Sequence, residues 1–213
     1  MTLSHLEKYV YDNPSIEELH FVVTGSSGFL GSNIVSSMSN LGLKGFAIDS
    51  KDTHDKIFSN KIAKQFKFIK ADLSSELDID MLKNTLPDSF HLIHLASPNT
   101  EKTNIVNKSN KIDFKGFTLQ SSIELSIAKN LLSLVKNRAS FFLYASSIDV
   151  FNTHGSDKKL VNEETQPIPD SPYGFGKLLS EGIYKTELKK LNIPLTILRL
   201  PQIYGDYEFL FYK

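Results

Sequence analysis

The 213-residue sequence contains no cysteine, which excludes disulfide bonds, thiolate zinc sites and a cysteine nucleophile. Its net charge is zero, because 24 lysines and arginines balance 24 aspartates and glutamates. A balanced chain does not favour binding to nucleic acid or to an anionic membrane. No apolar run is long enough to cross a bilayer, residues 1–14 do not resemble a signal peptide, and the histidines show no metal-ligand spacing. These absences predict a cytoplasmic protein without a metal site.

Hydrophobic residues make up 40% of the chain, which is enough for the core of one soluble domain. Short apolar runs alternate with helical patterns, as in an α/β protein with a parallel sheet. Strands are expected at residues 21–23, 45–49, 66–70, 90–96, 141–145 and 195–200. Helices are expected at residues 33–41, 76–84, 116–138 and 171–191, with long loops at residues 99–115 and 151–170.

Three glycines lie where the first strand gives way to the first helix, at positions 25, 28 and 31. Gly25 permits a tight turn, Gly28 lets a phosphate approach the backbone, and Gly31 lets the helix pack on the strand. The N–H groups and the positive dipole end of the helix would then face a pyrophosphate. A glycine-rich turn without a ligand is the alternative, but the strand before it and the helix after it favour dinucleotide binding.

Asp49 ends the second strand, 18 positions after Gly31. This is close to the spacing expected for the acid that accepts the ribose hydroxyls of a bound dinucleotide. A 2′-phosphate would meet a like charge at Asp49, so NAD is favoured over NADP. Lys51 weakens that preference, since its ammonium could pair with such a phosphate. The alternative is that Asp49 only caps the end of a strand.

Polar residues also follow the third and fourth strands. Asp72 is placed to accept from an adenine amino group, with Leu73 against the ring. His94 invites a catalytic role, but a buried histidine with satisfied hydrogen bonds is the more common case. The helix at 116–138 is apolar over more than one stripe, which suggests that another subunit covers part of it.

Tyr173 and Lys177 are four residues apart on a predicted helix and therefore share a face. A phenol is a poor base at neutral pH, with a pKa of about 10, and a lysine ammonium beside it favours the phenolate. A serine at the end of the fifth strand, Ser146 or Ser147, could hold a substrate oxygen while Tyr173 exchanges its proton. A surface pair of tyrosine and lysine would be the default interpretation if the other motifs were absent.

In this order, the motifs resemble those of the extended short-chain dehydrogenase/reductases, the NAD-dependent epimerase/dehydratase family that modifies nucleotide sugars. The resemblance covers residues 20–206 and rests on these segments: Thr24–Gly31, Asp49, Ala71–Leu73, His94–Ser97, Tyr144–Phe151, Ser171–Lys177 with Glu181, and Arg199–Gly205. It implies a Rossmann-type doubly wound parallel sheet with helices on both faces. It also implies a homodimer through the 116–138 and 171–191 helices.

The resemblance implies roles for particular residues. The catalytic hydroxyl lies three residues before the valine of the strand-five motif, which selects Ser147, and Tyr173 and Lys177 complete the catalytic set. A nucleotide sugar is the implied substrate and NAD the implied cofactor, with NADP less favoured. The residues expected to bind the cofactor are Gly25, Ser27, Gly28, Phe29, Leu30, Gly31, Asp49, Asp72, Leu73, Leu95, Ala96, Tyr173 and Lys177.

The sequence departs from the family pattern at several points. Glu124 stands where the long helix usually carries an asparagine, Ile148 stands where dehydratases carry an acid, and Gly176 replaces a frequent serine. The chain also ends at Lys213, so most of the substrate domain is expected to be missing. The expected division is an extension at 1–19, an NAD-binding domain at 20–206 and a remnant of the substrate domain at 207–213.

Several functions remain open at this stage. The leading hypothesis is an oxidoreductase that moves hydride and a proton at a sugar alcohol or ketone, as an epimerase, dehydratase, decarboxylase or reductase. A non-catalytic NAD-binding module and a reductase of non-sugar carbonyls are the alternatives.

Overall fold

The computed structural model describes residues 14–52, 65–98, 114–151 and 160–205, together with Lys8 and Asp12. The strands are β1 (His20–Thr24), β2 (Lys44–Asp49), β3 (Phe66–Lys70), β4 (Phe90–His94), β5 (Ala139–Ser147) and β6 (Leu195–Leu200). The helices are α2 (Phe29–Asn40), α3 (Glu76–Thr85), α4 (Phe114–Val135) and α5 (Pro172–Lys190), with short 3-10 turns η1 (Pro14–Glu18) and η3 (Ile148–Val150).

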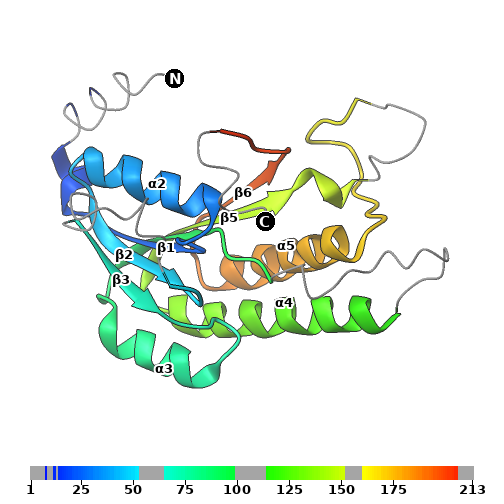
Figure 1. Ribbon diagram of the computed structural model, residues 1–213, viewed down its shortest axis with the longest axis horizontal. Coiled ribbons are helices and arrows are strands. Elements are labelled where there is room, and N and C mark those ends of the chain that lie inside the picture. Colours follow the sequence, from blue (N-terminus) through cyan, green and yellow to red (C-terminus); the bar gives the residue numbers. More distant parts are fainter. Residues whose placement is uncertain are drawn as a thin grey trace.

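The strands form one parallel sheet in the order β3-β2-β1-β4-β5-β6. Helix α2 covers one face, and α3, α4 and α5 cover the other (Figure 1). The chain adds β2 and β3 on one side of β1, and then β4, β5 and β6 on the other side. This is the topology of a doubly wound Rossmann sheet. The fold class expected from the sequence is therefore confirmed.

Two apolar layers flank the sheet, and alternation along each strand supplies both of them. Val22 of β1 belongs to the larger core cluster with residues of α3, α4 and α5, including Leu82, Leu131 and Leu188. Its neighbour Val23 belongs to the smaller cluster with Val35 of α2. The central strands are consequently buried on both faces, as a parallel sheet requires.

Several boundaries differ from the sequence prediction: α2 begins at Phe29 rather than at 33, β4 ends at His94 rather than at 96, and β5 begins at Ala139 rather than at 141. Helix α4 begins at Phe114 rather than Gly116 and ends at Val135 rather than Arg138. Asn137 adopts a positive φ of 62°, a left-handed conformation that asparagine tolerates and that stops the helix. Strand β5 includes Ser146 and Ser147, because both residues continue the ladder with β6.

Other parts of the sequence prediction lie outside the described residues. They are the extension ahead of Pro14 apart from Lys8 and Asp12, the segment 207–213, and the portions 99–113 and 152–159 of the two long loops. Within the described residues, no helix is long and apolar enough to span a bilayer.

A buried charge cluster fastens β5, β6 and α5 together. The carboxylate of Glu181, on α5, accepts from Ser146 Oγ at 2.6 Å and from Arg199 at 3.0 Å and 2.8 Å. Burial raises the pKa of Glu181, but the hydrogen bonds from Arg199 and Ser146 outweigh burial, and the pKa ends below its usual value. The cluster holds the carboxyl ends of two strands against one helix.

The start of α5 packs closely on η3. Ser171 caps the helix, as the sequence predicts, by accepting from the N–H of Gly174 at 3.0 Å. A Cβ atom at Gly174 would overlap the carbonyl oxygen of Asp149, so only glycine fits there. This contact fixes the first turn of α5, which carries Tyr173, against the residues that follow β5.

We expect Gly174→Ala to destabilise the protein by about 3 kcal/mol or more, since the added methyl forces backbone apart. Gly182→Ala is the matched control on the same helix, because a Cβ atom there meets nothing within 4 Å. Alanine is the better helix former, so the control should gain about 0.5–1 kcal/mol. Urea denaturation of both variants makes the comparison. Equal stability of the two would contradict the close packing of α5 on η3.

Candidate functional site

The glycine turn between β1 and α2 packs against the chain that leaves β4. Gly25 has a φ of 71°, and a Cβ atom on it would lie 2.6 Å from the backbone nitrogen of Ala96. Leu95 N donates to Thr24 O at 3.1 Å and Ala96 N donates to Thr24 Oγ1 at 3.4 Å. The structure thus brings together three residues that the sequence predicts to bind the cofactor.

The N-terminus of α2 has the features of an anion site. Its N-cap is Gly28, no side chain caps the helix, and its first turn contains no acidic residue. The first N–H groups of a helix have no partners within the helix, and they carry the positive end of its dipole. A Cβ atom at Gly31 would overlap the carbonyl oxygen of Gly25, so the turn can be this tight only with glycine. A pyrophosphate fits this arrangement.

Asp49 lies beside the glycine turn, as its spacing predicts. Its carboxylate accepts from Ser27 N at 3.0 Å and from Lys51 N at 2.9 Å, one bond to each oxygen. Each carboxylate oxygen can accept a second hydrogen bond, so Asp49 still has acceptors for the two hydroxyls of a ribose. Asp49 therefore stabilises the glycine turn and is also a candidate to bind the ribose of a dinucleotide.

Asp72 and Leu73 follow β3, next to Asp49 in the sheet. The backbone of Ala71 donates to Asp49 O at 2.8 Å, which sets the two strand ends side by side. Asp72 Oδ1 accepts from the N–H and the hydroxyl of Ser74 at 2.8 Å and 2.7 Å. Leu73 is buried, and its carbonyl accepts from Asn130 of α4 at 2.9 Å. One carboxylate oxygen of Asp72 therefore accepts hydrogen bonds within the local turn.

Lys177 occupies the buried side of α5, with only 2% of its surface exposed. Its ammonium donates to Ala145 O at 3.1 Å and lies 4.9 Å from the ring centroid of Tyr144 and 5.7 Å from that of Tyr173. Burial lowers the pKa of Lys177, although the negative charge of Glu124 opposes this effect. The structure thus bonds the ammonium of Lys177 to β5 near the end of that strand and places it close to the ring of Tyr173.

The two serines at the end of β5 have different environments. Ser146 is buried and gives its hydroxyl hydrogen to Glu181. Ser147 is half-buried, and its hydroxyl accepts from Asp149 N at 3.1 Å, which leaves the hydroxyl hydrogen available to another acceptor. This difference favours Ser147 over Ser146 as a group that contacts a ligand.

A layer of buried polar residues lies between β4, β5, α4 and α5. His94 Nδ1 is 2.7 Å from Thr24 Oγ1, while its Nε2 has no partner among the described residues. Burial, together with the charge of Lys177, holds the pKa of His94 well below its usual value, so the ring is neutral. His94 is therefore a buried residue as expected, but its hydrogen bonding is only half satisfied.

Sequence analysis missed most of this polar layer. It includes Gln120 and Glu124 on α4, and Ser180 and Tyr184 on α5. Gln120 and Glu124 are four residues apart on α4, whose other buried positions among the described residues are apolar apart from Asn130. That spacing on an apolar stripe is the signal that could have identified the layer from the sequence.

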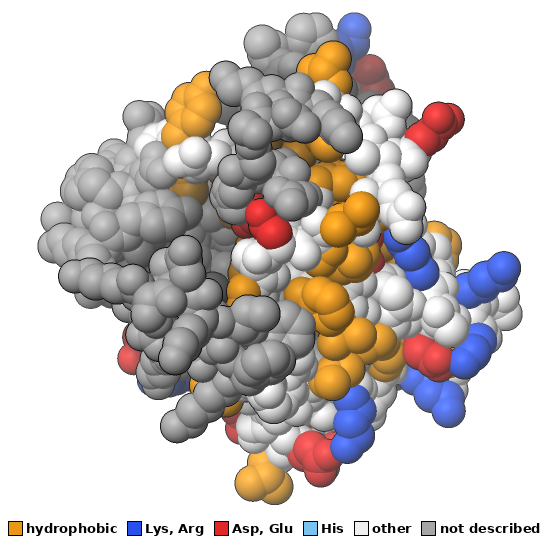
Figure 2. Space-filling model, turned by 90° about the vertical axis from the view of Figure 1, so that its right-hand side faces the viewer, with side chains coloured by type: hydrophobic (Ala, Val, Ile, Leu, Met, Phe, Trp, Pro, Cys, Tyr) orange, Lys and Arg blue, Asp and Glu red, His pale blue; other side chains and the backbone are white. Residues whose placement is uncertain are grey.

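The face toward which the strands run carries a band of hydrophobic side chains, with charged side chains gathered mainly to one side of it (Figure 2). Among the described residues, no group of three or more His, Asp or Glu side chains is arranged to hold a metal ion.

Comparison with solved structures supports the fold. The chain aligns with UDP-glucuronic acid 4-epimerase from Bacillus cereus in complex with NAD at a TM-score of 0.64 and 25% identity, covering 88% of this chain and 57% of that one. It aligns with dTDP-glucose 4,6-dehydratase from Bacillus anthracis in complex with NAD at a TM-score of 0.68 and 21% identity, covering 89% and 57%.

Curated relatives show the same partial coverage. A probable dTDP-glucose 4,6-dehydratase of Sinorhizobium fredii is 26% identical over 90% of this chain and 55% of its own length. A putative UDP-glucose 4-epimerase of Methanocaldococcus jannaschii is 28% identical over 88% of this chain and 57% of its own. The chain thus spans a little over half the length of these relatives. The sequence model described as "NAD dependent epimerase/dehydratase family" matches residues 21–210. This chain belongs to that family.

Proposed function

We propose that this chain forms the cofactor-binding part of an NAD-dependent enzyme that acts on a nucleotide-activated sugar. The observation that carries the proposal is the position of Lys177. Its buried ammonium is bound to Ala145 O and lies 5.7 Å from the ring centroid of Tyr173. A surface pair of tyrosine and lysine would leave the ammonium in water, where it would have little effect on the phenol.

Each residue of the site has a distinct task under this proposal. Ser147 donates its hydroxyl hydrogen to the oxygen of the reacting sugar carbon, and Tyr173 takes or returns the proton of that oxygen. Lys177 stabilises the phenolate form of Tyr173 by its charge. The bound NAD supplies a ring carbon that accepts or gives a hydride. Epimerase, dehydratase, decarboxylase and reductase outcomes all begin from this set.

The cofactor is held at the other half of the site. The N-terminus of α2 and the glycine turn receive the pyrophosphate, and Asp49 accepts the ribose hydroxyls. The carboxylate of Asp49 disfavours a 2′-phosphate, so we propose NAD rather than NADP. The two aligned structures support this choice, since the Bacillus anthracis dehydratase and the Bacillus cereus epimerase are both in complex with NAD.

A second candidate is a non-catalytic NAD-binding module. The chain spans 55–57% of the length of the curated relatives that it matches. The two candidates share the cofactor site and differ in whether a sugar nucleotide is converted.

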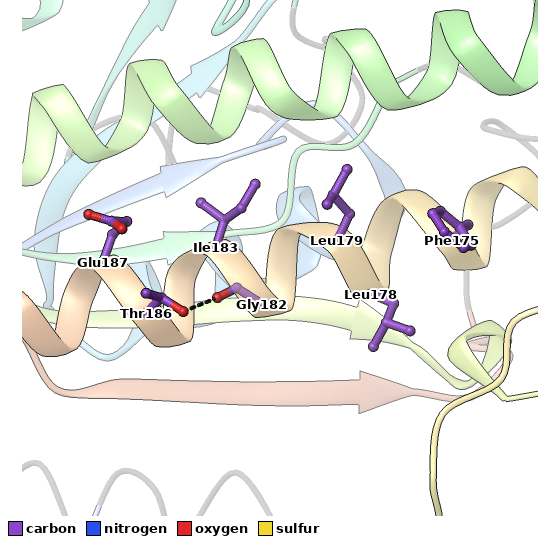
Figure 3. Close-up of a pocket in the computed structure, with 7 residues that line it drawn as sticks. All are labelled: Phe175, Leu178, Leu179, Gly182, Ile183, Thr186 and Glu187. Atoms are coloured by element: carbon purple, nitrogen blue, oxygen red, sulfur yellow. Dashed lines mark hydrogen bonds between the residues drawn. The ribbon is translucent and has the colours of Figure 1, made fainter.

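We further propose a homodimer through α4 and α5. An apolar groove along the outer side of α5 is lined by Phe175, Leu178, Leu179, Gly182, Ile183, Thr186 and Glu187. Figure 3 shows Phe175, Leu179 and Ile183 in a row along α5, on the side nearer α4. On α4, Leu119 and Leu125 are 45% and 44% exposed. A second copy that presents the same two helices would cover both sets of side chains.

For the cofactor, titration should show tighter binding of NAD than of NADP. Asp49→Asn keeps one acceptor for the turn but removes the charge, and it should weaken NAD about 10-fold to 100-fold while affecting NADP less. Calorimetry with each dinucleotide measures both affinities. Asp52→Asn is the control, because Asp52 is exposed and pairs only with Lys70 among the described residues. A clear preference for NADP would make Lys51 the residue that selects the cofactor.

For catalysis, Tyr173→Phe should lower turnover of UDP-glucose or dTDP-glucose about 10²–10⁴-fold, since phenylalanine has no proton to exchange. NAD affinity should stay within about twofold, because the ring is retained. Turnover is followed by chromatography of the sugar nucleotides and NAD binding by calorimetry. Wild-type activity in the variant would refute the assignment of Tyr173. NAD binding without any turnover in the unsubstituted chain would favour the non-catalytic module.

For assembly, sedimentation velocity should give a dimer for the chain and a monomer for Leu179→Glu, because a buried carboxylate without a partner opposes association. Leu77→Glu is the matched control, since Leu77 lies on α3 and is 82% exposed. It should remain a dimer. A monomer for the unsubstituted chain at micromolar concentration would overturn this proposal.

A further inference from the structure

Glu124 is a buried carboxylate in the contact between α4 and α5, with only 1% of its surface exposed. Its Oε1 accepts from Ser97 Oγ at 3.5 Å, and its Oε2 accepts from Ser180 Oγ at 3.2 Å. Both donors are neutral hydroxyls. A buried carboxylate with only neutral donors is costly unless a cation compensates its charge.

Among the described residues, the groups around Glu124 leave one candidate for that cation. Burial, with the charge of Glu124, raises the pKa of Tyr144 on β5 and of Tyr184 on α5, so both phenols are neutral. His94 on β4 is neutral as well. Within the part of this layer that the structure describes, Lys177 is the group that can carry a positive charge, and the charge of Glu124 acts on it against the effect of burial.

Gly176 makes room for this arrangement. A Cβ atom at Gly176 would lie 3.2 Å from Glu124 Cγ and 3.6 Å from Gln120 Cγ. The long side chains of α4 therefore occupy space that a larger residue on α5 would take. The absent side chain at 176 and the glutamate at 124 fit each other in size.

We propose that Glu124 is the fixed counter-charge of Lys177, a positioning residue that keeps the lysine protonated beneath the ring of Tyr173. It acts through Lys177. Its catalytic meaning rests on the proposed function, in which the ammonium of Lys177 stabilises the phenolate of Tyr173. The charge relation itself exists without any substrate.

Glu124→Gln tests the charge with little change of shape. The amide oxygen can still accept from Ser97 or Ser180, so the fold should be retained. We expect the pKa of Lys177 to fall by about one unit or more, because removal of a nearby negative charge disfavours the ammonium. NMR of the chain labelled in its lysine side chains follows the titration, and Lys177→Met assigns the signal.

Glu187→Gln is the control for the loss of one negative charge from the same pair of helices. Glu187 pairs with Lys190 near the end of α5, and its replacement should leave the titration of Lys177 unchanged. An unchanged titration in folded Glu124→Gln would overturn the proposal. A chain that failed to bind NAD, but whose Lys177 responded to Glu124→Gln, would refute the proposed function and leave the counter-charge standing.

A double-mutant cycle gives a second measurement that does not depend on NMR of the single variant. Lys177→Met should destabilise the chain more when Glu124 is present than when it is replaced by glutamine, since each replacement removes the partner of the other charge. If Glu124→Gln alone does not fold, the double variant should fold. Additive losses in urea denaturation, or failure of the double variant to fold, would contradict the proposal.

Discussion

Two backbone contacts that tolerate no side chain fix the geometry of the site. At Gly25 the turn after β1 lies against Ala96, and at Gly174 the first turn of α5 lies against Asp149. The first contact positions the N-terminus of α2 and the ends of β1 and β4. The second positions Tyr173 relative to Ser147. Because backbone moves less freely than side chains, these contacts hold the proposed cofactor site and the proposed catalytic residues in one rigid frame.

The sequence predicts the parts of this frame that depend on local chemistry. Glycine spacing, the carboxylate that ends β2 and the cap at Ser171 each follow from residues close together in the chain, and all three have their expected positions. The start of α4 was wrong by two residues, since a glycine at 116 resembles a boundary but lies within the helix. Most of the buried polar layer was missed because it forms only when α4, α5 and two strands meet, and its one local signal is the spacing of Gln120 and Glu124 on α4.

The charges of two buried carboxylates, Glu181 and Glu124, are compensated in different ways. Glu181 bonds directly to Arg199, in a bidentate pair that also satisfies Ser146. Glu124 bonds to hydroxyls, and its charge acts on Lys177 through the protein interior. A direct pair holds elements together by geometry, whereas a separated pair leaves the ammonium of Lys177 near the Tyr173 ring. The direct pair of Glu181 and Arg199 therefore stabilises the fold, whereas the separated pair of Glu124 and Lys177 fits the proton transfer proposed for Tyr173.

The position of β6 at the edge of the sheet determines which part of the described chain opens first. None of its residues is fully buried, and it pairs only with β5 among the described strands. A polar contact joins it to the interior, the bidentate bond from Arg199 to Glu181, and Leu195 and Ile197 pack against the core. Local opening therefore releases β6 at a lower free energy than β1 or β4, whose residues face the core on both sides. Amide hydrogens of β6 would then exchange with solvent ahead of those in β1 and β4.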